Sequence, residues 1–146
     1  MSQANDPKPE SVEGLKIEID KLKAESKFYQ ASKLLLHARV RLQRSRPPET
    51  NYTNEKWWQA ESAKDEVWIV QQLALCTYKN EEIPARKRLD QAMALLEEIG
   101  LRNGSNTNTE TLCLGGAAHK YKWQQFGQAE DLHESLSFYL SASERD

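Results

Sequence analysis

One segment determines how this chain folds: residues 110–123, which read Glu110-Thr111-Leu112-Cys113-Leu114-Gly115-Gly116-Ala117-Ala118-His119-Lys120-Tyr121-Lys122-Trp123. The segment opens a helix, because Thr107 and Glu110 have the spacing of a capping box. The small residues Gly115 and Ala118 let a second, antiparallel helix approach closely, and the large residues can fill the groove beside it. The segment therefore predicts a closely packed helical hairpin.

The composition of the whole chain favours helices. Its 146 residues include only 6 Gly and 5 Pro, too few for an all-β fold that needs a turn after every short strand. The length is sufficient for the core of one domain. Because 20 basic side chains nearly balance 22 acidic ones, a dedicated binder of nucleic acids or membrane surfaces is not expected.

Apolar spacing predicts six helices in three antiparallel pairs over residues 11–146, after a disordered lead-in at residues 1–10. The third helix is expected to be the longest, and its centre is apolar nearly all round, which is typical of a helix between two others. Pro84 is expected to start the fourth helix, and Gly100 to end it. The six predicted helices cover about residues 11–24, 28–45, 54–79, 84–99, 108–127 and 129–143.

The hairpins repeat a pattern. Large and small residues alternate as in the second helix of a tetratricopeptide repeat, with one serine in place of alanine. Two segments show this spacing: Phe28, Ala31, Leu35, Ala38 and Leu132, Ser135, Tyr139, Ala142. The second and third hairpins are longer than a standard repeat, so the units are degenerate. The sequence predicts an all-α, tetratricopeptide-like (TPR-like) solenoid.

The same segment carries a resemblance to a known family. The motif E-T-L-G-L-x-G-A-x-x-K-x-x-W is met at Glu110, Thr111, Leu112, Leu114, Gly116, Ala117, Lys120 and Trp123, with Cys113 where glycine is usual. Residues 67–139 thereby resemble the TPR-like TRAF-binding region of the apoptosis-signal-regulating MAP kinase kinase kinases and of many bacterial proteins. The resemblance implies a scaffold that binds proteins and regulates a signalling enzyme.

The end of the chain raises a further expectation. Family members usually continue for several more helices, and the sixth helix is apolar on more than one face before the sequence stops at Asp146. We therefore expect either the N-terminal part of a longer solenoid or self-association.

The sequence holds no catalytic or metal-binding constellation. His37, His119 and His133 lie on three different helices, and no H-E-x-x-H or G-x-S-x-G spacing occurs. We expect no enzymatic activity, no cofactor and no bound metal. Cys76 and Cys113 lie in apolar helical patterns, which indicates buried, reduced thiols. Neither a signal segment nor an apolar run of ~20 residues is present, so a cytoplasmic protein without a membrane span is predicted.

Two groups are candidates for contact with a protein partner. One is a basic and aromatic group at the end of the fifth helix, and the other is a pair of adjacent tryptophans, a residue type enriched at binding hot spots. Packing between hairpins is the alternative role for the aromatic rings. The candidates are His119, Lys120, Lys122, Trp123, Trp57 and Trp58.

An arginine cluster is the strongest charge feature. Arg39, Arg41, Arg44 and Arg46 could contact an anion or RNA, or could simply be cations at a helix C-terminus, where the macrodipole favours them. The sequence predicts a non-catalytic protein–protein interaction scaffold in a signalling or defence-type assembly, whose partner could be a fused or adjacent effector enzyme. The alternatives are a nucleic-acid-associated regulatory subunit that uses this cluster and a purely structural segment between two domains.

Overall fold

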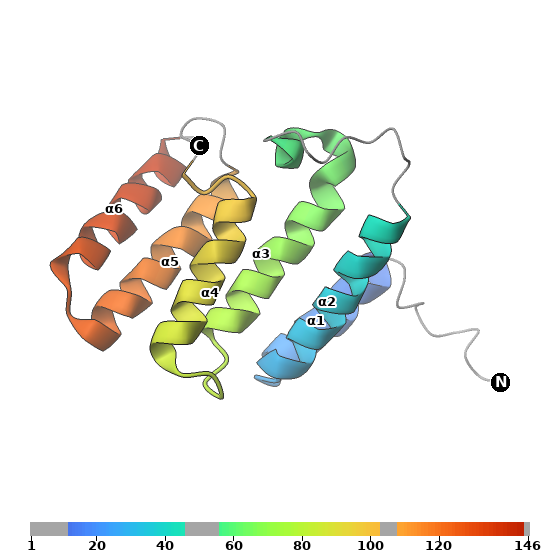
Figure 1. Ribbon diagram of the computed structural model, residues 1–146, viewed down its shortest axis with the longest axis horizontal. Helices are drawn as coiled ribbons and strands as arrows, with labels where there is room; N and C mark the ends of the chain where they lie inside the picture. The colour runs from blue at the N-terminus through green and yellow to red at the C-terminus, as the bar shows by residue number, and fades with distance from the viewer. Residues whose placement is uncertain (1–11, 46–55, 103–107, 145–146) are drawn as a thin grey trace.

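The structure is a computed structural model of the chain, and it describes residues 12–45, 56–102 and 108–144. These residues form six α-helices in three consecutive antiparallel pairs, which lie side by side in a row (Figure 1). This arrangement confirms the predicted all-α, TPR-like solenoid of helical hairpins. The pairs are α1 (Val12–Ala24) with α2 (Phe28–Arg44), α3 (Lys64–Tyr78) with α4 (Ala85–Glu98), and α5 (Thr109–Phe126) with α6 (Ala129–Ser143).

Several helix ends lie where local chemistry requires them. Gly100 and Gly127 follow α4 and α5 with φ angles of 88° and 72°, a left-handed conformation that glycine adopts without a steric penalty. Asn108 is the N-cap of α5, and its side chain accepts hydrogen bonds from the backbone N–H groups of Glu110 and Thr111. The predicted cap, Thr107, lies outside the described residues.

The third helix is shorter than predicted. Two 3-10 turns, η2 (Trp57–Gln59) and η3 (Glu61–Ala63), precede α3, because the extended backbone at Ala60 interrupts the helical hydrogen bonds. The interruption lets Trp58 lie against Gly100. The prediction that this helix is the longest was wrong, since α3 has 15 residues and α5 has 18. Residues 1–11 and 46–55, which include the predicted lead-in, lie outside the described part.

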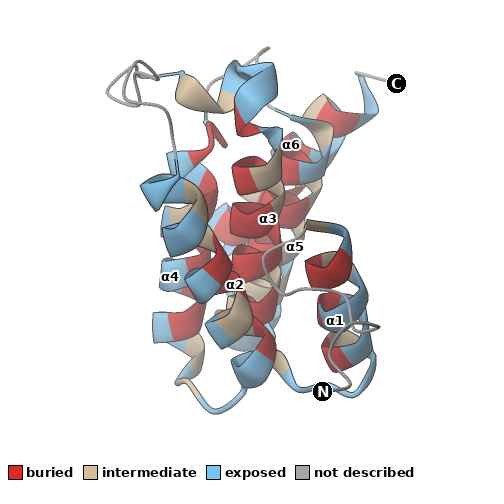
Figure 2. Cartoon of the chain, turned by 90° about the vertical axis from the view of Figure 1, so that its right-hand side faces the viewer, coloured by how far each residue is buried: buried red, intermediate tan, exposed pale blue. Residues whose placement is uncertain are grey.

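Helix α3 is buried on two faces, as its sequence predicted. Val70 and Ala74 belong to a core cluster shared with α4, α5 and α6, whereas Ile69 and Leu73 belong to a second cluster shared with α1 and α2. Figure 2 shows buried residues along most of α3, while α1 keeps an exposed face. Among the described residues, the two cores therefore meet through this helix and its neighbour α4, whose Leu95 packs against both.

The small residues of α5 allow the close approach of α6 that the opening segment predicted. A Cβ at Gly116 would lie 2.9 Å from the Tyr139 ring of α6, and one at Gly115 would lie 2.6 Å from Leu101. The Ser135 hydroxyl donates a 2.7 Å hydrogen bond to the Gly116 carbonyl, so serine adds a bond at this contact while remaining small.

Candidate functional site

An apolar groove of about 420 Å³ lies between α2 and α4, with α3 at its base. Tyr29 and Leu36 line it from α2, Leu73 lines it from α3, and Leu95 lines it from α4. Tyr29 and Leu36 are 52% and 50% exposed, which is unusual for large apolar side chains that gather in one place. The volume lies within the usual range for ligand-binding pockets.

The sequence of α2 explains why one wall of this groove is apolar. Ala31 and Leu35 belong to the stripe that α2 buries against α1 and α3. Tyr29, Leu36 and Val40 form a second stripe at helical spacing, and all three are exposed. Helix α2 is thus apolar on two faces, of which only one is covered by the rest of the described structure.

Arg39 on the α2 wall of the groove forms ion pairs with the helices at its base and on its opposite wall. Its Nε lies 3.0 Å from Glu66 Oε2 on α3, and its Nη2 lies 2.8 Å from Glu98 Oε1 on α4. Glu66 is buried, and Glu98 lines the groove. Because charge-assisted hydrogen bonds of this kind are stronger than neutral ones, the pair helps to fix the width of the groove.

The predicted arginine cluster is therefore divided. Arg39 is engaged by two carboxylates, and Arg41 and Arg44 lie on the exposed side of the last turns of α2. Arg46 lies outside the described residues. Two neutralising partners on Arg39 reduce the positive charge that an anion would meet here, so the arrangement gives no particular support to nucleic-acid binding.

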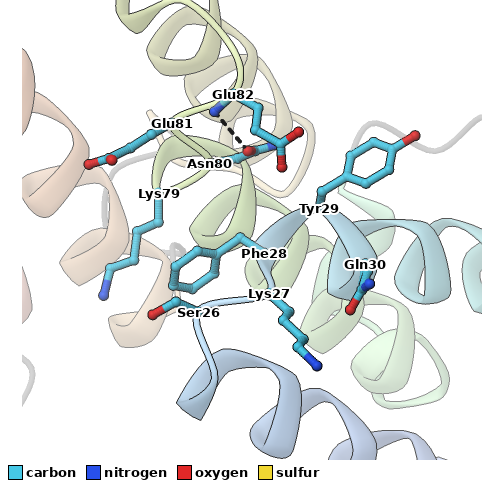
Figure 3. A pocket seen from close by; sticks show the side chains of 9 residues that line it. All are labelled: Ser26, Lys27, Phe28, Tyr29, Gln30, Lys79, Asn80, Glu81 and Glu82. Atoms are coloured by element: carbon cyan, nitrogen blue, oxygen red, sulfur yellow. Dashed lines mark hydrogen bonds between the residues drawn. The ribbon is translucent and has the colours of Figure 1, made fainter.

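A polar hollow of about 580 Å³ adjoins the groove at the turn between α1 and α2 (Figure 3). It shares Tyr29 and Asn80 with the groove. Figure 3 shows the Phe28 ring beside Ser26 and Lys79, and the Asn80 side chain accepts a hydrogen bond from the Glu82 backbone N–H. Lysines and glutamates both line the hollow, so its charge selects neither anions nor cations.

His119, a candidate for partner contact, lies in the core between α5 and α6. Its Nδ1 is 3.0 Å from Asp131 Oδ1, and its ring stacks on Phe138 at a centroid distance of 5.7 Å. Both His119 and Asp131 are buried. The residue has a packing position and is not on the surface.

The rest of that candidate group separates in space. Lys120 is exposed, whereas the Lys122 ammonium lies 3.5 Å from the Asp90 carboxylate of α4 and Trp123 is partly buried. His119, Lys120, Lys122 and Trp123 therefore do not form a single contact surface in this structure.

The two adjacent tryptophans pack against the core. Trp57 and Trp58 are both partly buried and border the cluster built by α3 to α6. The indole of Trp58 covers Gly100, and its Nε1 is buried with no hydrogen-bond partner in the described structure. Their position favours the packing role over that of free interface anchors.

The two thiols differ in their surroundings. Cys76 is fully buried, and burial raises the pKa of its thiol to about 11. Cys113 is only partly buried, so the prediction of two buried thiols holds for Cys76 alone. Neither cysteine forms a disulfide. Over the described residues, no three metal-ligating side chains come together, and no helix is long and apolar enough to cross a membrane.

Comparison with known sequences now identifies the repeat class. The sequence model of a family described as Tetratricopeptide Repeats-Sensor (TPR-S) matches residues 49–146. The chain belongs to the TPR-S family. This result supports the predicted TPR-like class, but it does not extend to the narrower TRAF-binding family. No curated protein and no solved structure matches the chain significantly.

The groove extends beyond the part of the chain that matches the TPR-S family. Helices α3 and α4 lie within the match, but α1 and α2 lie outside it. The wall that carries Tyr29 and Leu36 is therefore an addition to the matched TPR-S region. The sequence analysis did not identify these two residues. Together with Val40 they form a second apolar stripe on a helix that already has one stripe to bury, and this pattern could have indicated an exposed apolar face.

Proposed function

We propose that this TPR-S chain is a non-catalytic protein-interaction module that binds its partner in the groove between α2 and α4. The observation that supports this most is the pair of half-exposed side chains, Tyr29 and Leu36, above an apolar floor that includes Leu73. Clustered exposed apolar residues on a soluble domain are typical of interaction sites. We place the module in a signalling or defence-type assembly, in line with the word sensor in the family description.

The shape of the groove favours a helical ligand. On its α2 wall, the apolar lining side chains run from Tyr29 to Leu36, a span of about 10 Å along the helix axis. A partner helix that carries apolar residues at positions i, i+3 or i+4, and i+7 matches that length. An effector enzyme, fused or separate, would then be regulated through such a helix.

A pair of matched substitutions tests this proposal. Leu36→Glu puts a carboxylate on the groove wall, and Ile17→Glu makes the same change at a 63% exposed position on α1, outside the groove. The native chain and both variants are immobilised and exposed to lysate of the source organism. We expect Ile17→Glu to retain the captured protein, and Leu36→Glu to lose at least about tenfold, because a charge buried in an apolar site is costly.

The result that would contradict the proposal is equally clear. Far-UV circular dichroism first establishes that both variants are folded. If Leu36→Glu then captures the same proteins in the same amounts as Ile17→Glu, the groove is not the binding surface.

A further inference from the structure

A second apolar face lies at the other end of the solenoid. Leu136 and Leu140 of α6 are 54% and 62% exposed, and Tyr139 beside them is also exposed. Among the described helices, α6 packs almost entirely on α5. Its outer face is therefore uncovered, and its apolar residues have the spacing that a helix needs to enter a groove.

We propose that α6 of a second copy occupies the groove between α2 and α4, so that copies of the chain associate head to tail. The inference rests on the proposed function of the groove and names its partner. Each copy carries both halves of the contact: a groove with Tyr29 and Leu36 on its wall, and a helix with Leu136 and Leu140 on its free face.

Charge complementarity singles out this occupant. Helix α2 contains Lys33, Arg41 and Arg44, besides Arg39, whose charge Glu66 and Glu98 already neutralise, and it contains no Asp or Glu. Helix α6 contains Glu130, Asp131 and Glu134 and no Lys or Arg. Opposite charges around matching apolar stripes favour encounter in one register and disfavour pairing of like with like.

Helix α6 remains acidic when the charges that are already paired within the chain are left out. On α6, Asp131 is bound to His119 and Glu134 to Arg102. Glu130 in the first turn and Glu144 just after the last turn are exposed. In an antiparallel docking on α2, Glu130 would approach the end that carries Arg44, and Glu144 would approach the end that begins at Lys27. The first contact brings opposite charges together, whereas Lys27 already lies 3.1 Å from the Glu25 carboxylate, so the second contributes less.

A symmetric contact between two α6 helices fits less well. An antiparallel α6 pair would bring the acidic first turn of one copy close to Glu144 of the other, and like charges in close contact are unfavourable. The groove and α6 are different surfaces, so their contact is heterologous and leaves one groove and one α6 free at the ends of each assembly. Association should therefore continue beyond a dimer as the concentration rises.

Complementary variants test the head-to-tail contact. Leu36→Glu blocks the groove and leaves α6 intact, whereas Leu136→Glu blocks α6 and leaves the groove intact. Sedimentation velocity is measured for the full chain up to about 100 µM, where weak interfaces are populated. We expect the native chain and the Ile17→Glu control to form dimers and larger species, and each blocked variant alone to remain at 16.8 kDa.

The decisive sample is the equimolar mixture. Since each blocked variant supplies the half that the other lacks, the mixture should form a 1:1 complex that does not grow further. If Leu36→Glu still self-associates while Leu136→Glu does not, the contact is a two-fold one through α6 and the proposal is wrong. A mixture that stays monomeric, or a native chain that stays monomeric, also overturns it.

These outcomes remain separate from those of the capture experiment. The native chain could prove monomeric while Leu36→Glu abolishes the capture of another protein. That result would support the groove as a binding site and would reject only the second copy as its occupant. Should a glutamate variant fail to fold, Leu36→Ser and Leu140→Ser repeat the mixing with a milder change on the same two faces.

Discussion

The contact between Trp58 and Gly100 gives the sharpest test of the fold. A Cβ added at Gly100 would lie 2.5 Å from the indole, far inside contact distance, and the residue has a φ of 88°. At Gly127, φ is 72° but a Cβ would meet nothing within 4 Å. The two positions share the backbone penalty for a non-glycine residue and differ in the steric one, so Gly127→Ala is the matched control for Gly100→Ala.

The expected loss of folding free energy for each variant follows from this difference. A left-handed conformation costs an alanine about 1 kcal/mol, which is the whole effect expected for Gly127→Ala. Gly100→Ala must also displace Trp58. Because that indole is only partly buried, its displacement should cost about 2 kcal/mol, less than the removal of a fully buried tryptophan. We expect the free energy of unfolding to fall by about 3 kcal/mol in total for Gly100→Ala.

A double-mutant cycle isolates the steric part. In a Trp58→Ala background the clash is absent, so Gly100→Ala should cost only about 1 kcal/mol, which leaves a coupling energy of about 2 kcal/mol between the two positions. Urea denaturation followed by circular dichroism at 222 nm measures all four free energies. Equal losses for Gly100→Ala and Gly127→Ala, or a coupling energy near zero, would refute the placement of Trp58.

Three further outcomes are expected. Burial raises the pKa of the Cys76 thiol from 9.0 to about 11, so this thiol alone should lower the free energy of unfolding by about 2 kcal/mol as the pH rises from 9 to 11. In Cys76→Ala the fall should begin only near pH 10, where Tyr78, whose pKa burial raises to about 12, begins to contribute; identical curves would contradict this. A thiol reagent should label Cys113 in the native protein long before Cys76, and mass spectrometry of the digested protein identifies the modified residue. Arg88→Met should lower the free energy of unfolding by about 3 kcal/mol in a urea titration, because the buried guanidinium donates hydrogen bonds to the carbonyl of Tyr78 and to the hydroxyl of Tyr121; a loss under 0.5 kcal/mol would show that these bonds contribute little.

The parts of the fold that depend on local chemistry could be predicted from the sequence. The sixth helix spans residues 129–143 in both the prediction and the structure, since the preceding glycine ends one helix and an amphipathic pattern starts the next. Gly100 and Gly127 terminate helices because few other residues adopt their backbone angles. The doubly buried centre of α3 was visible as a run of apolar residues.

The features that were missed depend on contacts between distant segments. The break before α3 accompanies the packing of Trp58 on Gly100, 42 positions later in the sequence. His119 is buried beside Asp131 of the next helix, which gives its Nδ1 a hydrogen-bond partner, although its Nε2 has none in the described structure. The groove exists only where Leu36 and Leu95 face each other across α3, and no pattern within either helix encodes that distance.

The division of the core into two clusters has a consequence for how the molecule unfolds. Helices α1 and α2 are held to the rest through Ile69, Leu73 and Cys76 on one face of α3 and through the Arg39 ion pairs. The first hairpin can therefore open as a cooperative unit while α3 to α6 keep their own core. Opening removes the wall that bears Leu36 and so abolishes the groove. A ligand in the groove would then act as a clamp, protecting the amide protons of α1 and α2 from exchange in proportion to its concentration, although it touches nothing in α1.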